Sequence, residues 1–158
     1  MLQRFCRTVF ELCRMIRLSH SLLALPFAFM GAILAARGLP DWHTACYILV
    51  AMVGARSAAM AFNRLADESF DALNPRTAQR SLPQGRVSRG AAVAFTVVSA
   101  AVFIWAAAQL NRVCLILSPL ALAVVLGYSL TKRFTWGTHL ILGLSLALAP
   151  AGGWLAVR

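Results

Sequence analysis

The sequence predicts an all-α fold, a multi-pass transmembrane helical bundle, and three observations lead to this prediction. The 158 residues are 60% hydrophobic with a mean hydropathy of +0.74, and 13% are charged, against about 25% in a soluble domain. The apolar residues form runs close to the roughly 20 residues that cross a bilayer as a helix. Arginines lie between these runs. Because a spanning segment must satisfy its own backbone hydrogen bonds, the runs are expected to be helices.

The expected elements follow one another along the chain. Residues 1–17 carry four arginines interleaved with Phe and Leu, a pattern typical of an amphipathic helix at the membrane surface. A polar segment covers about residues 63–89, and a short basic loop covers 131–137. The five expected spans lie at about residues 18–36, 44–62, 90–110, 113–130 and 138–157.

The basic residues predict an orientation in the membrane. The formal charge of +10 does not indicate nucleic acid, because the arginines flank apolar runs and do not line one polar face. With the N-terminus in the cytoplasm, eleven Lys and Arg residues fall on the cytoplasmic side and three on the other. This bias predicts an inner (cytoplasmic) membrane protein whose 63–89 and 131–137 loops are both cytoplasmic.

Acidic residues are rare, and three of the five stand within five positions. Asn63, Asp67 and Asp71 recur every four residues and would share one face of a helix. Two carboxylates that close repel each other unless a cation lies between them, and Mg²⁺ prefers oxygen ligands and shared phosphates. We interpret the three residues as Mg²⁺ ligands and the two aspartates as catalytic. The alternative is a solvated helix end with acids by chance, as for Glu68, which points off that face.

Two arginines follow the acids. Arg76 and Arg80 are four residues apart, and the guanidinium fork suits phosphate oxygens. Acids that hold a metal, followed by arginines, make a diphosphate site. The alternative is topological charge alone, which is the preferred reading for Arg86 and Arg89.

A second cytoplasmic loop offers another pair. Tyr128 and Lys132 are also four residues apart, and Lys132 is the single lysine of the chain. Its ammonium could reach a leaving diphosphate. An interfacial Tyr and a snorkelling Lys, which membrane proteins commonly carry, are the alternative.

Arg56 interrupts the second span. It precedes Asn63 by seven residues and Asp67 by eleven, offsets that return nearly to the same helical face. A charged residue inside the membrane usually faces a cavity or a partner. We therefore expect Arg56 to bind substrate deeper in the membrane than the acids, with a structural pairing to a helix-end carbonyl as the alternative.

These residues carry a resemblance to a known family. Residues 56–85, with the NxxxDxxxD pattern of Asn63, Asp67 and Asp71 and the arginine that follows, closely resemble the first aspartate-rich motif of UbiA-type aromatic prenyltransferases. Tyr128 and Lys132 look like the YxxxK element of that family. The resemblance covers the whole chain, residues 1–158, as the N-terminal part of a single prenyltransferase domain.

The resemblance also predicts what this chain lacks. It implies nine spans and a second aspartate-rich motif, whereas this sequence has five expected spans and no second acidic pair. We therefore expect a fragment whose C-terminal half is missing, and we expect it to be inactive alone.

The function that the resemblance implies is transfer of a polyprenyl group from polyprenyl diphosphate to an aromatic carboxylate. Residues 19–28 and 62–65 are similar to a branch labelled 4-hydroxybenzoate polyprenyltransferase, which serves quinone synthesis with Mg²⁺. One alternative acceptor is a dihydroxynaphthoate of futalosine-route menaquinone synthesis. Another alternative is a non-catalytic transport or assembly protein, which predicts charges facing each other across several spans; Arg56 alone lies in mid-span. A CDP-alcohol phosphotransferase would need a DGxxAR-type run, which is absent.

Overall fold

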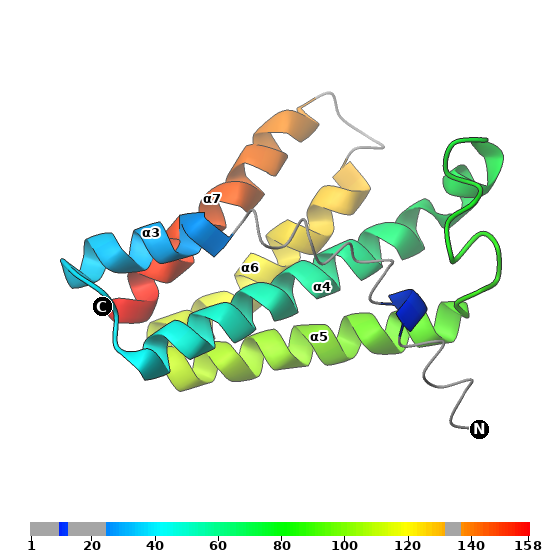
Figure 1. Ribbon diagram of the computed structural model, residues 1–158. Helices are drawn as coiled ribbons and strands as arrows, with labels where there is room; N and C mark the ends of the chain where they lie inside the picture. The colour runs from blue at the N-terminus through cyan, green and yellow to red at the C-terminus, as the bar shows by residue number, and fades with distance from the viewer. Residues whose placement is uncertain (1–9, 13–24, 132–136) are drawn as a thin grey trace, which may run out of the picture.

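The protein is a bundle of helices. The computed structural model describes residues 10–12, 25–131 and 137–158, and every regular element within these ranges is a helix (Figure 1). The main helices are α3 (Leu25–Ala36), α4 (Trp42–Leu73), α5 (Arg89–Leu110), α6 (Arg112–Thr131) and α7 (Thr138–Val157). Of these, α4 to α7 are long and apolar enough to cross a membrane. The predicted all-α multi-pass membrane fold is confirmed.

The bounds agree with the predicted spans except in two places. The last three spans match α5, α6 and α7 to within a residue at each end. The second span is predicted to end near residue 62, and α4 continues beyond that point as one helix to Leu73. Of the first predicted span, only the part from Leu25 onward is described, and of the predicted surface helix only residues 10–12 are.

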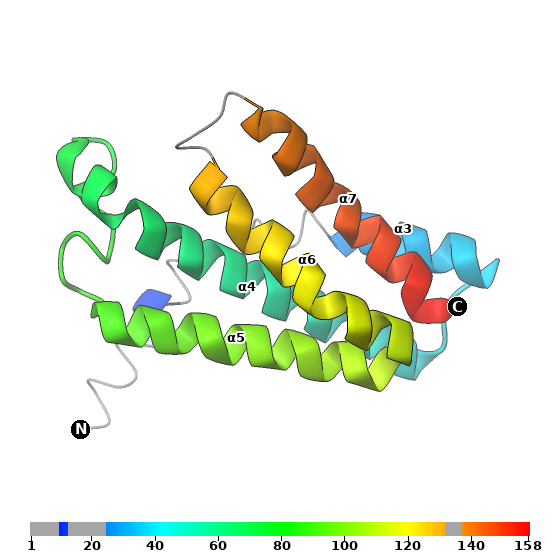
Figure 2. The same cartoon turned by 180° about the vertical axis from the view of Figure 1, so that it is seen from behind.

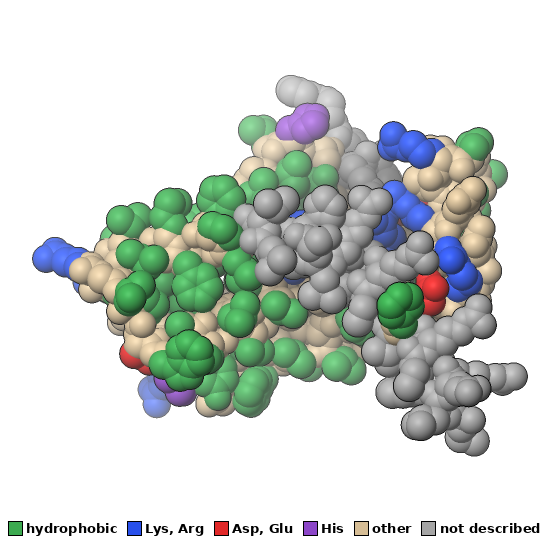
Figure 3. All heavy atoms as spheres, viewed as in Figure 1, with side chains coloured by type: hydrophobic (Ala, Val, Ile, Leu, Met, Phe, Trp, Pro, Cys, Tyr) green, Lys and Arg blue, Asp and Glu red, His purple; other side chains and the backbone are tan. Residues whose placement is uncertain are grey.

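The helices form two tightly packed pairs joined by α6. Helix α4 packs along α5, and α3 packs against α7, while α6 contacts α4, α5 and α7. Figure 2 shows α6 lying between α7 on one side and α5 on the other. Hydrophobic side chains cover the flanks of the long helices, and charged side chains gather toward the ends (Figure 3). An exposed apolar flank of this kind is the surface expected to face lipid.

Small residues let α4 approach α5. Gly54 lies so close to α5 that a Cβ there would sit 3.0 Å from the backbone nitrogen of Phe103. Ala58 and Ala61 are fully buried, as is Ala92 on α5. Membrane helices associate through such small residues, because lipid supplies no hydrophobic force to push them together.

The crossing of α3 and α7 depends on two glycines. A Cβ on Gly31 would collide with the backbone carbonyl of Pro150, and a Cβ on Gly153 would collide with that of Ala28. Each glycine therefore fits against the backbone of the opposite helix, where a side chain has no room.

A single asparagine joins three helices at one end of the bundle. Asn111 ends α5, and its Oδ1 accepts a hydrogen bond from the backbone nitrogen of Cys114 in the first turn of α6, at 2.8 Å. Its Nδ2 donates to the carbonyl of Leu155 in α7, at 2.6 Å. Further along α6, Pro119 cannot donate to the carbonyl of Leu115, and the Ser118 hydroxyl donates to it instead, at 2.8 Å.

The N-terminus of α4 is capped by Asp41, whose side chain accepts a hydrogen bond from the backbone nitrogen of Thr44 at 3.0 Å. Hydrogen bonds from the Thr44 side chain and backbone hold the pKa of Asp41 below its ordinary value, which is about 3.9. The cap therefore stabilises the helix above that pH, and its contribution is lost as the pH falls through the lowered pKa.

The length of α4 places its far end outside the hydrocarbon core. Trp42 begins α4, and Trp105 and Trp154 lie near the ends of α5 and α7, so three tryptophans gather at one end of the bundle. Such aromatic residues mark a membrane interface. About 20 helical residues cross the core of ~30 Å, so a helix that starts at Trp42 leaves it near residue 62. The rest of α4, from Asn63, then lies at the level of the lipid headgroups.

The glycine crossing generates a prediction. Gly31→Ala is expected to lower the free energy of unfolding by about 1–3 kcal/mol, the typical effect of overpacking, because the new methyl group meets backbone that cannot move aside. The measurement is thermal unfolding of the purified protein in detergent. Gly143→Ala in α7 is the matched control, because its Cβ meets nothing within 4 Å. Equal behaviour of the two variants would contradict the crossing.

Candidate functional site

The structure places Asn63, Asp67 and Asp71 on successive turns of one continuous helix. Gly54 and Ala61 occupy the face of α4 that packs on α5. At about 100° per residue, Asn63 and Asp67 lie roughly half a turn from Gly54. These two residues therefore stand on the side of α4 opposite to α5, and Asp71 is rotated away from them by part of a turn.

Asp71 is held by an arginine from the following loop. Nη1 of Arg80 lies 2.7 Å from Oδ1 and 2.5 Å from Oδ2 of Asp71. Asp71 is 7% exposed, so the carboxylate is buried, while the side chain of Arg80 is partly exposed. A buried carboxylate needs such a partner, because its desolvation is otherwise costly. Arg80 was predicted to bind diphosphate, and the structure brings it to one of the predicted metal ligands.

The loop between α4 and α5 is folded onto the end of α4. The Thr77 hydroxyl donates to the backbone carbonyl of Asp71 at 3.1 Å. Asn74 accepts a hydrogen bond from the backbone nitrogen of Arg76 at 3.0 Å, a turn typical of Asn before Pro. The side chain of Arg76 is exposed beside this turn. The loop therefore presents Arg76 to solvent and Arg80 to Asp71.

Sequence reasoning missed a second buried carboxylate at this loop. Glu11 is 8% exposed and Ser81 is 7% exposed, and Oγ of Ser81 donates to Oε2 of Glu11 at 2.6 Å. Leu12 packs beside them against Leu82 and Val87. The available signal was the isolation of Glu11, the single acidic residue in the basic stretch 1–17.

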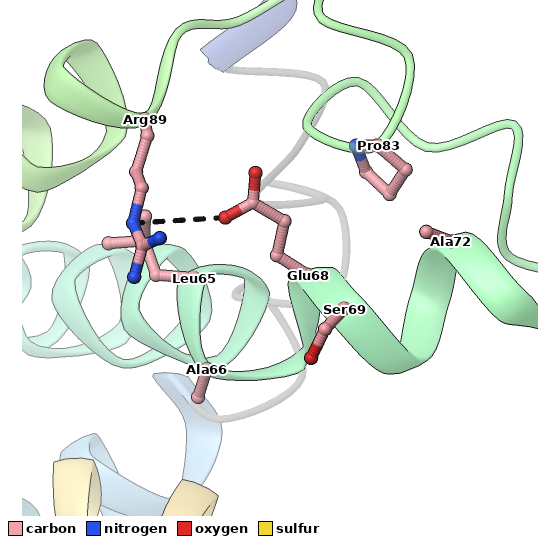
Figure 4. Close-up of a pocket in the computed structure, with 7 residues that line it drawn as sticks. All are labelled: Leu65, Ala66, Glu68, Ser69, Ala72, Pro83 and Arg89. Atoms are coloured by element: carbon pink, nitrogen blue, oxygen red, sulfur yellow. Dashed lines mark ion pairs between the residues drawn. The ribbon is translucent and has the colours of Figure 1, made fainter.

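A surface hollow lies on a different side of α4. It has a volume of about 560 Å³ and is lined by Leu65, Ala66, Glu68, Ser69, Ala72, Pro83 and Arg89. In Figure 4, Glu68 and Arg89 reach toward each other, and their closest nitrogen and oxygen atoms are 3.9 Å apart. Residues 65, 68 and 72 lie near the α5 side of α4. None of the predicted site residues lines this hollow, and Glu68 points off the Asn63 face as predicted.

Arg56 lies deeper along α4 than the acids. Seven residues separate it from Asn63, or about 10 Å along the helix axis at 1.5 Å per residue. Its Nε is buried and has no hydrogen-bond partner among the residues that the structure describes. A buried donor without a partner is costly, so Nε is available to donate a hydrogen bond to an acceptor group.

Tyr128 lies in the last turn of α6 and is half-buried. Helix α6 contacts α4 and runs in the same direction, so Tyr128 stands at the same end of the bundle as Asp67. The predicted partner Lys132 lies outside the described residues. The structure therefore places one member of the predicted pair.

The donor set at the end of α4 fits a partial Mg²⁺ shell. Two carboxylates and one amide oxygen match a cation that binds through one or two carboxylates and completes its shell with water and substrate phosphates. Within the described part of the chain, no three His, Cys, Asp or Glu side chains gather to hold a metal by themselves. A cation here would need ligands from a substrate or from elsewhere.

Comparisons with known proteins agree on one family. The model of the UbiA prenyltransferase family matches residues 24–158. The chain is 34% identical over 139 residues to the 4-hydroxybenzoate octaprenyltransferase of Aliivibrio fischeri (strain MJ11), covering 88% of this chain and 48% of that protein. It is 33% identical over 156 residues to the enzyme of that name from Vibrio atlanticus (strain LGP32), covering 99% and 55%.

A solved structure agrees as well. The apo structure of a UbiA homolog from Aeropyrum pernix K1 matches with a TM-score of 0.83 and 42% identity, over 88% of this chain and 50% of that one. The chain thus spans about half the length of the relatives it matches. The family model covers most of the chain, and the sequence and structural relatives carry the same assignment. The chain belongs to the UbiA prenyltransferase family.

Proposed function

We propose that this chain forms the diphosphate-binding, N-terminal part of a single prenyltransferase domain. The enzyme transfers a polyprenyl group from polyprenyl diphosphate to an aromatic carboxylate such as 4-hydroxybenzoate. The names of the curated relatives support this acceptor. A dihydroxynaphthoate offers the same carboxylate and an electron-rich ring, and it remains the alternative. Because the relatives are about twice as long, we propose that turnover needs a C-terminal half with further ligands.

The observation that carries the proposal is the polar end of α4. Asn63, Asp67 and Asp71 follow one another up a helix that has left the hydrocarbon core, and Arg80 already contacts the last of them. A diphosphate whose prenyl tail lies among the helices would have its charged group at this level. Long apolar substrates with one charged end suit a site at such a boundary.

Asn63, Asp67 and Asp71 would hold Mg²⁺, which supplies positive charge to the diphosphate when it is bound. The contacts of Arg80 to Asp71 use Nη1 alone, and a guanidinium carries five N–H donors. Arg80 can therefore keep Asp71 and still donate to a phosphate oxygen. Arg76 is exposed beside it, and Lys132, four residues after Tyr128 in the sequence, would contact other diphosphate oxygens.

The chemistry then follows from charge stabilisation. Charge held on the diphosphate lets the allylic C–O bond break, with both electrons leaving on the diphosphate oxygen. The ring carbon of the acceptor forms the new C–C bond to the allylic cation, and that carbon loses its proton. The helices exclude water that would otherwise capture the cation.

Arg56 would bind the carboxylate of the acceptor. Its Nε is buried, has no hydrogen-bond partner in the described part of the chain, and lies about two turns deeper than Asn63. A carboxylate matches the guanidinium fork in charge and geometry. The acceptor would then lie below the diphosphate, near the allylic end of the prenyl chain. A quinol or lipid glycerol would leave this donor without an anion.

The first prediction concerns the acids. The chain is expected to bind a non-hydrolysable farnesyl thiodiphosphate in the presence of Mg²⁺ and to lose binding in EDTA. Asp67→Asn and Asp71→Asn should each weaken binding by roughly 10-fold or more, the effect of losing a charge-assisted contact. Isothermal titration in detergent measures the affinity. Glu68→Gln is the matched control, since Glu68 is on another face; an equal loss there would refute the site.

The second prediction concerns Arg56. Arg56→Ala should weaken 4-hydroxybenzoate binding by roughly 10- to 150-fold, the effect of a charge-assisted hydrogen bond, and leave the affinity for the thiodiphosphate unchanged. Arg56→Lys should restore part of the loss, because an ammonium cannot make the paired contact. The two affinities are measured on the same preparations. Unchanged acceptor binding together with a lower unfolding temperature would assign Arg56 a structural role.

The third prediction concerns orientation, which we propose to be cytoplasmic for the 74–88 loop. A single cysteine at the exposed position Gln84, in a background without the four natural cysteines, should resist an impermeant thiol reagent in intact cells and react after lysis. A cysteine at the exposed Gly38, at the tryptophan end, should react in intact cells. The opposite pattern would place the proposed site outside the cell.

A further inference from the structure

Two buried carboxylates contact the loop that follows α4. Asp71 contacts Arg80, and Glu11 contacts the next residue, Ser81. Two of the five acidic residues of this chain thus contact adjacent positions of one loop, although the two acids are 60 residues apart in the sequence. Burying a carboxylate is costly, and an apolar residue could fill the same space, so the buried Glu11 calls for an explanation.

We infer that Glu11 is a positioning residue of the diphosphate site. Acting through Ser81, it places the 74–88 loop so that the guanidinium of Arg80 stays over Asp71. The role of the loop in diphosphate binding rests on the proposed function. The role of Glu11 in fixing the position of the loop rests on the contacts alone.

The contacts around Glu11 explain how one carboxylate can set the loop. The Ser81 hydroxyl donates to Oε2 at 2.6 Å, while Oε1 lies 4.0 Å from Nη1 of Arg86. Arg86 also donates through Nη2 to the carbonyl of Gln79, at 2.6 Å. The backbone nitrogen of Val87 donates to the carbonyl of Ser81 at 3.2 Å. Glu11 therefore contacts a segment, residues 79–87, whose ends are hydrogen-bonded to each other.

The apolar neighbours give the contact its strength. Leu12, Leu82 and Val87 form a buried cluster with Ala61 of α4 and Ala92 of α5. This cluster excludes water from the Glu11–Ser81 hydrogen bond, and a bond in such surroundings is stronger than one in water. The pair between Arg86 and Glu11 is longer and its guanidinium is partly exposed, so it adds little. The hydrogen bond to Ser81 is the contact that sets the position of Arg80.

Trypsin cleavage after Arg80 and Arg86 measures loop release without any substrate. Glu11→Ala and Ser81→Ala should each speed cleavage roughly 10- to 100-fold, because the lost bond shifts the opening equilibrium by that factor. The double variant should cleave no faster than the faster single variant, since the two changes remove one interaction. Glu11→Gln keeps an acceptor for the hydroxyl and should cleave at nearly the wild-type rate.

The same variants are tested for Mg²⁺-dependent binding of farnesyl thiodiphosphate. Glu11→Ala should weaken binding roughly as much as Arg80→Ala does, and Glu11→Gln should restore it. Glu11→Met fills the space without an acceptor and should behave like Glu11→Ala. Glu68→Ala is the control, because its contact to Arg89 is 3.9 Å long and partly exposed; it should change neither measurement.

The outcomes separate the two proposals. Wild-type-like cleavage and binding in Glu11→Met would show that Glu11 only fills space and would overturn the inference. Additive effects of Glu11→Ala and Ser81→Ala would overturn it as well. If the wild-type chain binds no thiodiphosphate but the cleavage results hold, the positioning of the loop stands and the proposed function fails.

Discussion

The ion pair between Asp71 and Arg80 closes the loop after α4 onto the end of that helix, and the arrangement of the polar end depends on it. Asp71 is buried by the loop that carries its own counter-ion. Removing Arg80 would leave the buried carboxylate of Asp71 without its counter-ion, which is far more costly than the pair itself is stabilising. Thr77, Ser81 and Val87 then add hydrogen bonds that hold the loop in the closed position. The contacts at the polar end thus depend on one another. In the predicted membrane spans, by contrast, Arg56 is the one charged residue in mid-span.

The two parts of the molecule follow different packing rules because they lie in different solvents. Within the hydrocarbon core, burial of apolar groups gives helices no reason to associate, so close approach at Gly54, Gly31 and Gly153 holds the bundle together. Beyond the core, water is present, and the cluster around Leu12 and Leu82 packs by the hydrophobic effect. Helix α4 extends from the hydrocarbon core into the headgroup region. A helix of 32 residues can therefore both cross the membrane and carry the residues of the candidate site.

Much of this architecture was predictable from the sequence. Long apolar runs predict membrane spans, and a spacing of four residues predicts that side chains share one face of a helix. Asn63 and Asp67 were placed on one helical face, and α5, α6 and α7 were bounded closely. The end of α4 was not predictable from hydropathy, since a helix that continues into the headgroup region changes composition without changing conformation. The partners of Asp71 and Glu11 were not predictable either: Arg80 is nine residues away and Ser81 seventy, and only the folded loop decides which donors meet which carboxylates. The roles of these residues in catalysis stay predictions.

Asn111 has a consequence for how the protein is made. Its bond to the backbone of Cys114 is local and can form as soon as the α5–α6 hairpin enters the bilayer, but its bond to Leu155 requires α7. Until α7 arrives, the amide nitrogen must stay at the membrane surface, where water can satisfy it. The asparagine thus offers the incoming α7 a hydrogen-bonding partner at this end of the bundle.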